Sequence, residues 1–264
     1  MSAVQAAHPN LGTATGPDAP VSSDAGSWKA LGWQLFGIAV ALSLVVLFLA
    51  TADLSATERT TLAPAALWGY TVEHLALTAV AAVIVLAIAI PLGVLLTRAP
   101  LRRFSGPVMA VANFGQAAPA IGLIVLLAMW VGFGFWAAII ALVLYAVLPV
   151  LRNTMVGLRQ VDDRLVEAGR GMGMSSSAVL WKIELPLAVP IMLAGIRTAL
   201  VLLVGTATLA TFINGGGLGI LIITGVNLGL TVVLVCGSVL VALLALVVDW
   251  VGRLVEHVAR PKGI

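Results

Sequence analysis

The chain has 264 residues, of which 61% are hydrophobic and only 9% are charged. A typical soluble domain is about half apolar and a quarter charged, so this composition excludes an ordinary soluble enzyme or binding module. The net charge of +3 is small and gives no signal for nucleic-acid binding.

Uncharged stretches predict the membrane-spanning helices. Lys, Arg, Asp and Glu are absent from four runs, residues 30–52, 75–97, 104–151 and 198–248. A helix needs about 20 apolar residues to cross a bilayer, so each short run holds one span and each long run holds two. The runs lack the alternation of a membrane barrel. We therefore predict an all-α membrane protein, a bundle of six spans near residues 31–50, 74–97, 107–131, 133–151, 188–212 and 229–251.

Basic residues predict the orientation. With both termini in the cytoplasm, nearly all Lys and Arg residues fall on that side and only Arg59 lies outside. This asymmetry predicts a multi-pass protein whose loop at residues 152–187 is cytoplasmic. The same scheme divides the chain into a disordered cytoplasmic tail (residues 1–28), a membrane domain (29–252) and a second cytoplasmic tail (253–264).

Few side chains could support catalysis or metal binding. The three histidines, His8, His74 and His257, are scattered, and the sequence has no G-x-x-x-x-G-K-[ST] phosphate loop. The single cysteine, Cys236, lies in an apolar stretch, and no Ser/His/Asp or Cys/His constellation is recognisable. We therefore predict no catalytic residue, no metal site and no cofactor in this chain.

The cytoplasmic loop begins with a short predicted helix. Asp162 and Asp163 can cap it, because acidic side chains accept hydrogen bonds from the first free N–H groups of a helix. Three glycines, Gly169, Gly171 and Gly173, are expected to break this helix and to permit close backbone approach.

A second short helix is predicted at residues 178–185, capped by the serines at 175–177. Pro186 is expected to end this helix or to bend the chain into the next span. Two short helices joined by glycines form a compact knob that can dock in a groove of another protein. From periodicity alone, an amphipathic connector resting on the bilayer surface is an alternative.

The loop also carries a motif, Glu-Ala-Gly, three residues, Gly, nine residues, Ile, one residue, Leu-Pro. Its residues are Glu167, Ala168, Gly169, Gly173, Ile183, Leu185 and Pro186. The motif resembles the E-A-A-x3-G-x9-I-x-L-P loop of ABC importer permeases and departs from it only at Gly169, which replaces Ala. The resemblance implies that this loop docks on a separate ATPase subunit, which binds ATP and Mg²⁺. The missing methyl group at 169 is expected to loosen the first helix without abolishing docking.

Two further segments resemble one group of these permeases. Residues 113–120, NFGQAAPA, are similar to the Q-T-I-P-S segment of permeases for glycine betaine, carnitine and choline. Residues 205–219, GTATLATFINGGGLG, are similar to that group's G-T-A-T-L-A-x-F-I-G-x-G-G-L-G. Residues 152–154 and 195–199 also fit the group. The departures are Ala117, Ala118, Ala120 and Asn214.

The resemblance implies a type I ABC importer permease (MetI-like) fold in a bacterial inner membrane. It implies import of glycine betaine, choline or a similar quaternary-ammonium solute, with the ATPase activity on a partner, so that this chain is not itself an enzyme. The implied partners are ABC ATPase subunits, an extracytoplasmic substrate-binding protein and a second permease chain, either a copy or a paralogue. The aromatic cage for the ammonium group is expected on the binding protein, because the spans hold few aromatic residues.

The predicted translocation pathway consists of polar or helix-breaking residues within the spans, namely Asn113, Gln116, Pro119, Thr206, Thr208 and Asn214. Gln116 would be costly against lipid, and Pro119 can kink its helix and free a carbonyl group. The threonines could instead bond to their own helix backbone. Glu73 is assigned to the outer loop, so no carboxylate is expected on the spans.

Other polar and small residues in the spans are given structural roles. Gly93, Gly205 and Gly237 are predicted to be helix-packing contacts, and Arg197 an anchor at the membrane surface.

Two alternative functions stay open. An ABC permease for another small solute, such as an amino acid or an ergothioneine-like betaine, would keep the Glu167 loop and differ around Gln116. A channel or a secondary transporter is disfavoured, because long uncharged runs leave no proton or sodium relay.

Overall fold

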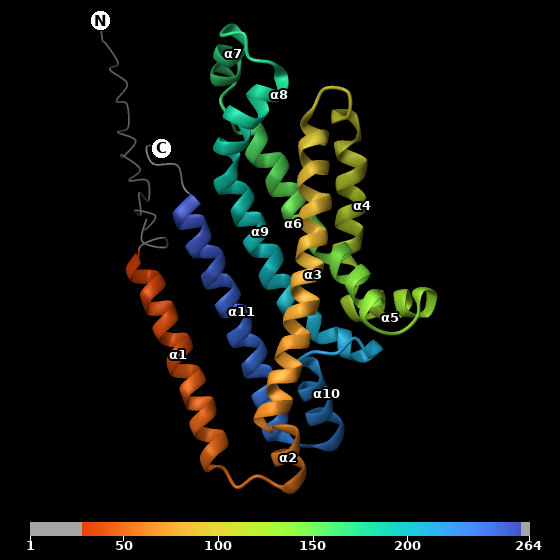
Figure 1. The fold of residues 1–264 in the computed structure, drawn as a ribbon. Helices are drawn as coiled ribbons and strands as arrows, with labels where there is room; N and C mark the ends of the chain where they lie inside the picture. Colours follow the sequence, from red (N-terminus) through yellow and green to blue (C-terminus); the bar gives the residue numbers. More distant parts are fainter. Residues whose placement is uncertain (1–27, 260–264) are drawn as a thin grey trace, which may run out of the picture.

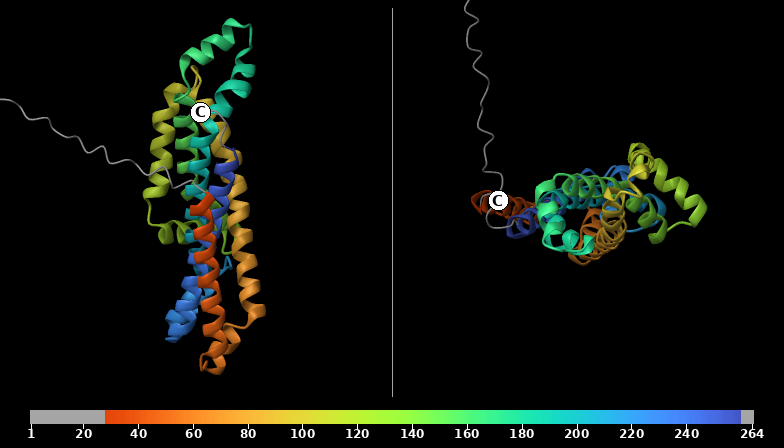
Figure 2. Two further views of the ribbon diagram at one scale, coloured as in Figure 1. Left: turned by 90° about the vertical axis from the view of Figure 1, so that its left-hand side faces the viewer. Right: turned by 90° about the horizontal axis from the view of Figure 1, so that it is seen from above.

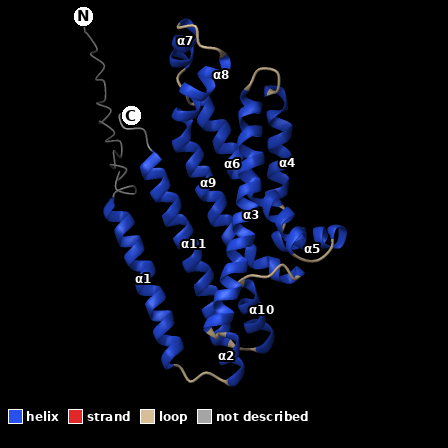
Figure 3. Ribbon diagram, in the orientation of Figure 1, coloured by secondary structure: helices blue, strands red, loops and turns tan. Residues whose placement is uncertain are grey.

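The computed structural model describes residues 28–259, and all regular structure in this range is helical (Figure 3). Five stretches are long and apolar enough to cross a membrane, and a bent helix pair raises the number of spans to six. The predicted all-α bundle of six spans is therefore confirmed. Four of the long helices are α1 (Trp28–Thr51), α3 (Pro64–Thr97), α6 (Phe135–Arg159) and α11 (Thr231–Ala259), and α9 (Leu185–Ala207) forms most of the fifth stretch.

The structure bears on the predicted tails to a different extent at the two ends. Apart from Trp28, the predicted tail at residues 1–28 lies outside the described residues. At the other end, α11 continues through Ala259, so residues 253–259 are helical and not part of a tail.

Helices α3, α6 and α9 form the centre of the bundle, with α11 packed on α9 and α1 on α11 (Figure 1). Helix α1 is peripheral, since only Leu31 and Ile38 are buried along its length. Two polar contacts hold it: Trp250 Nε1 donates to the Leu31 carbonyl at 2.9 Å, and Gln34 Nε2 donates to Asp249 at 3.0 Å.

Small residues allow the central helices to approach closely. Ala81 and Ala89 of α3 and Ala138 and Ala146 of α6 are completely buried. In lipid, helices associate mainly through dispersion contacts and hydrogen bonds, which favours small residues where two helices meet.

Three glycines in the spans were predicted to be packing contacts, and the prediction holds for two of them. An added Cβ would lie 2.8 Å from the Thr154 side chain at Gly93, and 2.6 Å from the Leu221 Cβ at Gly237. At Gly205 it would meet no heavy atom within 4 Å. Gly205 is therefore not a packing contact within this chain.

The expected third span, residues 107–131, is two helices. Helix α4 (Ser105–Ala117) and helix α5 (Ala120–Val131) meet at an angle of 99°. Ala118 adopts an extended conformation because the ring of Pro119 disfavours a helical conformation in the residue before it. Pro119 thus breaks the helix completely instead of bending it, and α5 projects sideways from the bundle (Figure 2).

The connection between the last two spans is also more structured than predicted. After α9, a 3-10 helix (Thr208–Ile213) leads to Asn214 in the left-handed region and to the glycines at 215–217. A short helix, α10 (Gly219–Leu228), follows before α11. Before α3, helix α2 (Ala56–Thr61) starts with a capping box in which hydrogen bonds from Ser55 lower the pKa of Glu58.

The loop between α6 and α9 lies at the same end of the bundle as the start of α1 and the end of α11 (Figure 1). Helix α6 continues to Arg159, two turns beyond the predicted end of its span. The polar loop is therefore raised above the rest of the bundle on the ends of two long helices.

Candidate functional site

The raised loop contains the helix α7 (Asp163–Gly171) and the short helix α8 (Ser176–Val179). Asp162 caps α7 by accepting the Arg164 N–H at 2.9 Å, and Ser175 caps α8 by accepting the Ala178 N–H at 3.3 Å. The predicted capping by Asp162 and by a serine at 175–177 is therefore confirmed, and the second helix starts at Ser176, two residues before the predicted start.

The predicted helix ends differ from the structure. Gly169 and Gly171 lie inside α7, and the break comes at Gly173, whose φ of +82° is unfavourable for residues with a side chain. The second predicted helix, residues 178–185, does not end before the next span, because α8 continues through a π-helical turn (Leu180–Glu184) into α9. Pro186 lies in the first turn of α9, where its missing N–H is tolerated next to the wider π turn.

Gly169 is buried because α7 packs against the end of α8 and the π turn. An added Cβ at this position would lie 2.6 Å from Ile183 Cδ1 and 3.4 Å from a methyl group of Val179. Two residues of the motif, Gly169 and Ile183, are thus in direct contact. The missing methyl group makes room for Ile183, and α7 is continuous through Gly169. The expected loosening of this helix is not seen.

The remaining surface of the loop is exposed, including Glu167 and Gly173. It also exposes large apolar side chains: Leu165 is 47% exposed, Met172 75% and Trp181 70%. Such residues on a raised loop, together with charged neighbours, are typical of a surface that binds a partner.

An ion pair ties this loop to the bundle. The guanidinium group of Arg98, at the end of α3, makes two hydrogen bonds to the carboxylate of Glu184 in the π turn, one of them 3.1 Å long. Glu184 is buried, and a two-pronged pairing of this kind fixes both position and orientation. Sequence reasoning missed this pair because Glu184 occupies the unspecified position of the motif and Arg98 was considered only for orientation.

Arg197 of α9 is also paired, with residues of α11. Its guanidinium group lies 3.0 Å from Glu256 and 3.6 Å from Asp249, and Arg253 lies 2.8 Å from Asp249. The prediction that Arg197 is an anchor at the membrane surface stays a prediction. Acidic residues on α11 hold it between two spans.

The predicted pathway residues do not form one cluster of mutual contacts. Gln116 makes a long contact of 3.5 Å with the Tyr145 carbonyl of α6, while Asn113 is exposed. Thr206 donates to Leu202 O at 2.8 Å and Thr208 to Gly205 O at 2.7 Å, so both hydroxyl groups bond to their own helix. Pro119 sits at the break between α4 and α5, and Asn214 sits at the glycine turn. Their role in translocation stays a prediction.

The glycine turn is held by two adjacent residues of α3 that sequence reasoning had placed outside the site. Glu73 Oε2 accepts the Gly217 N–H at 3.0 Å, and His74 Nδ1 accepts the Leu218 N–H at 3.3 Å. His74 is completely buried, and its Nε2 lies 2.9 Å from the Val204 carbonyl, to which it donates. Glu73 had been assigned to the outer loop, but α3 begins at Pro64, so this carboxylate does lie on a long helix.

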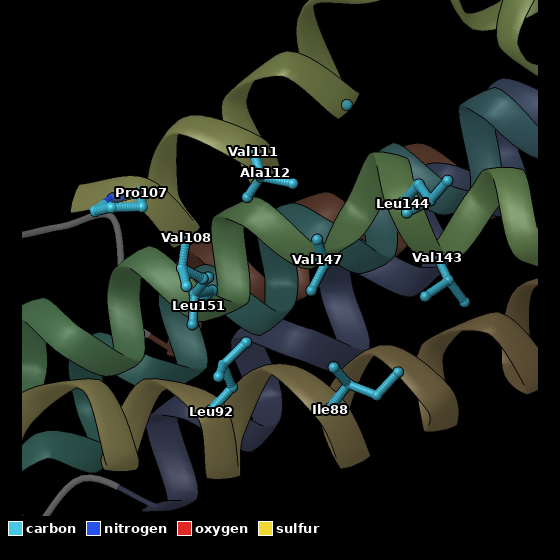
Figure 4. A pocket seen from close by; sticks show the side chains of 11 residues that line it. Ile88, Leu92, Pro107, Val108, Val111, Ala112, Val143, Leu144, Val147 and Leu151 are labelled. Atoms are coloured by element: carbon cyan, nitrogen blue, oxygen red, sulfur yellow. The ribbon is translucent and has the colours of Figure 1, made fainter. Parts of the chain in front are cut away.

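A cavity of about 400 Å³ opens between α3, α4 and α6. Figure 4 shows its lining side chains, which come from all three helices. They are entirely apolar, for example Ile88 and Leu92 of α3 and Val111 of α4. This cavity therefore offers no polar group to a charged solute.

Comparison with known proteins agrees with this geometry. Residues 89–260 match the family described as "Binding-protein-dependent transport system inner membrane component". The chain is 41% identical over 192 residues to the glycine betaine/carnitine/choline transport system permease protein OpuCB of Bacillus subtilis, covering 73% of this chain and 88% of that protein. It is 40% identical over 194 residues to the choline transport system permease protein OpuBB of the same organism, covering 74% and 88%. It is 37% identical over 199 residues to the osmoprotectant import permease protein OsmW of Salmonella typhimurium, covering 74% and 92%.

The fold has a solved counterpart. A chain of the MetNI methionine ABC transporter, in an inward-facing conformation, matches with a TM-score of 0.64 and 27% identity, covering 73% of this chain and 95% of that one. The helical bundle, the raised Glu167 loop and these similarities lead to one conclusion. The chain belongs to the family of inner-membrane permease components of binding-protein-dependent ABC transport systems.

Proposed function

We propose that this chain is the permease subunit of an ATP-driven importer for quaternary-ammonium compatible solutes such as choline or glycine betaine. In this proposal it pairs with a second permease chain, as a homodimer or with a paralogue. Two ATPase subunits bind at the end of the bundle that carries α7 and α8, and a separate extracytoplasmic protein delivers the solute. That end and both termini face the cytoplasm.

The observation that carries the proposal is the raised loop between α6 and α9. The loop exposes Glu167 and the apolar side chains of Leu165 and Met172, while its inner side is packed through Gly169 and Ile183. A rigid knob with an exposed mixed surface is suited to a groove on another protein. The Arg98–Glu184 pair would pass a displacement of this knob to α3 and α9.

ATP-driven closure of the ATPases would then favour one arrangement of the spans over another. A ligand shifts such an equilibrium only through a difference in its affinity for the two states. The α7–α8 knob links the ATPases to the arrangement of the spans, because it contacts the ATPases directly and stands on two central helices. The affinity for ATP can therefore differ between the two arrangements.

The substrate class is supported by the relatives. The Bacillus and Salmonella permeases named above serve choline, glycine betaine, carnitine or osmoprotectants according to their descriptions. A permease for an amino acid is the second candidate, favoured by the likeness to the methionine transporter.

Two substitutions test coupling. Glu167→Lys reverses a charge on the exposed face, and Gly173→Leu places a side chain where φ is +82°. Both variants should reach the membrane at normal levels yet recover less ATPase in a pull-down and import less solute. Ser177→Ala, at an exposed position that the motif leaves unspecified, is the matched control.

Normal ATPase recovery and normal uptake for both variants would contradict docking at this loop. Uptake of labelled choline, glycine betaine and methionine by the reconstituted complex separates the two substrate classes. Import of methionine alone would overturn the proposed class.

A further inference from the structure

A second cavity, of about 450 Å³, lies where α3 meets the glycine turn. The turn lies just before α10, in the half of the bundle that is remote from α7 and α8 (Figure 1). The volume of the cavity falls within the usual range of about 300–1,000 Å³ for small-molecule sites. Unlike the cavity of Figure 4, it has polar side chains in its wall, which is formed by Tyr70, Glu73, Thr211, Asn214, Gly215, Gly216 and Ile220.

The turn is built around the Glu73 carboxylate. Oε2 accepts the Gly217 N–H at 3.0 Å, and an added Cβ at Gly216 would lie only 2.7 Å from the same oxygen. Gly216 and Gly217 have φ values of +85° and +92°, which residues with side chains rarely adopt. These glycines therefore let the backbone pass close to the carboxylate and hold it at the cavity wall.

No cation within residues 28–259 balances this carboxylate. Each Arg that forms an ion pair in this range does so with Glu184, Asp249 or Glu256. The neighbouring His74 is engaged on both ring nitrogens, and since Nδ1 accepts an N–H, the ring is neutral in this arrangement. The cavity thus has a net negative wall that is open to a mobile cation.

Tyr70 adds an aromatic surface to the same wall. It precedes Glu73 by three residues, so both side chains lie on one face of α3, and both line the cavity. A quaternary ammonium group has no N–H to donate and is held instead by a negative charge and by the face of an aromatic ring. Glu73 provides the negative charge and Tyr70 provides the aromatic ring.

We propose that this cavity is a transit subsite for an organic cation entering from the binding protein. Glu73 supplies the charge, Tyr70 the ring, and the Asn214 amide a polar contact for the neutral end of the solute. The inference rests on the proposed function and refines it. A single fixed carboxylate favours a cation with a hydroxyl end, such as choline, over a zwitterion such as glycine betaine, whose own carboxylate it repels.

The test uses the complete importer in vesicles, with saturating solute-loaded binding protein, and compares initial uptake of choline and glycine betaine. Glu73→Gln removes the charge but keeps an oxygen that can accept the Gly217 N–H. We expect choline uptake to fall at least about fivefold and glycine betaine uptake to change less than about twofold, a ratio that a purely structural role would not move. Tyr70→Leu should also lower choline uptake, and Tyr70→Phe should preserve it.

Glu58→Gln is the matched control, because Glu58 is a carboxylate in the α2 capping box that does not line the cavity, and Gln also serves at this position. Equal loss of both solutes in Glu73→Gln, or an unchanged ratio, would overturn the subsite. A wild-type complex that imports glycine betaine but not choline would also overturn it while leaving the proposed function standing. Failure of the wild type to import any quaternary ammonium solute would overturn the proposed function itself.

Discussion

The substitution Gly195→Ala, which adds one methyl group, tests the contact between α6 and α9, the two helices that carry the α7–α8 knob. A Cβ added at Gly195 would lie 2.4 Å from Asn153 Cβ and 2.8 Å from the Pro149 carbonyl oxygen. Ordinary contact starts near 3.4 Å, so the helices would have to part by about 1 Å, the difference between 3.4 and 2.4 Å. Neither neighbour can rotate away, since one is a Cβ and the other a backbone atom.

The expected cost of Gly195→Ala follows from two opposing terms. Overpacking a tight contact costs about 1–3 kcal/mol, and replacing Gly by Ala inside a helix returns about 0.5–1 kcal/mol. The net effect is a loss of up to about 2.5 kcal/mol, centred on about 1 kcal/mol, in the free energy of unfolding. Gly205→Ala, on the same helix, is the matched control because an added Cβ there meets no atom within 4 Å.

Thermal unfolding of the purified permease in detergent measures the difference. Gly195→Ala should lower the midpoint temperature, and Gly205→Ala should keep or raise it. Uptake per molecule should also fall in Gly195→Ala, because the knob depends on the spacing of α6 and α9. A midpoint for Gly195→Ala equal to that of the wild type would refute the close contact between these helices.

Three further outcomes are expected. In a Cys236→Ser background, a cysteine replacing Ser176 should react with an impermeant reagent only from the cytoplasmic side, and labelling from outside in intact cells would invert the topology. Gln116→Leu should reduce uptake without affecting assembly, and unchanged uptake would reassign Gln116 to packing. Glu184→Ala should destabilise the protein by about 1–3 kcal/mol, less than a fully buried pair because Arg98 is partly exposed. Adding Arg98→Gln should recover part of that loss, and simple additivity of the two effects would contradict the pairing.

The long helices were predictable because charge is so costly in lipid that uncharged runs mark the spans. The same rule fails where a run is longer than its spans require. Residues 198–248 contain the end of α9, the 3-10 helix, α10 and most of α11, and the apolar composition does not distinguish a helix that crosses from a short one that does not. Pro119 indicated a disturbance, but the 99° angle between α4 and α5 could not be read from it, because α5 packs against distant parts of the chain, α6 and the 3-10 helix.

The polar contacts were less accessible than the helices. Glu73 was missed because the predicted span was started after the last charged residue. Helix α3 instead begins at Pro64, about three turns before the uncharged run, so Glu73 lies within it. Arg98 and Glu184 are 86 positions apart, and no local pattern links them. The caps of α7 and α8 were predictable since each depends only on side chains within a few residues.

The distribution of paired charges assigns different mechanical roles to the two ends of the bundle. Glu184, in the turn that leads from α8 into α9, is matched by Arg98, and in the proposed importer this pair fixes the spans where force from the ATPases would enter. At the glycine turn, Glu73 accepts the Gly217 N–H and forms no ion pair within residues 28–259, so in the proposed subsite its charge is available to a passing solute. If a cation beside Glu73 weakens the hydrogen bond between the Gly217 N–H and this carboxylate, the glycine turn becomes more mobile while the solute is present. A release of this kind would couple occupancy of the cavity to movement of the 3-10 helix and α10, which flank the turn.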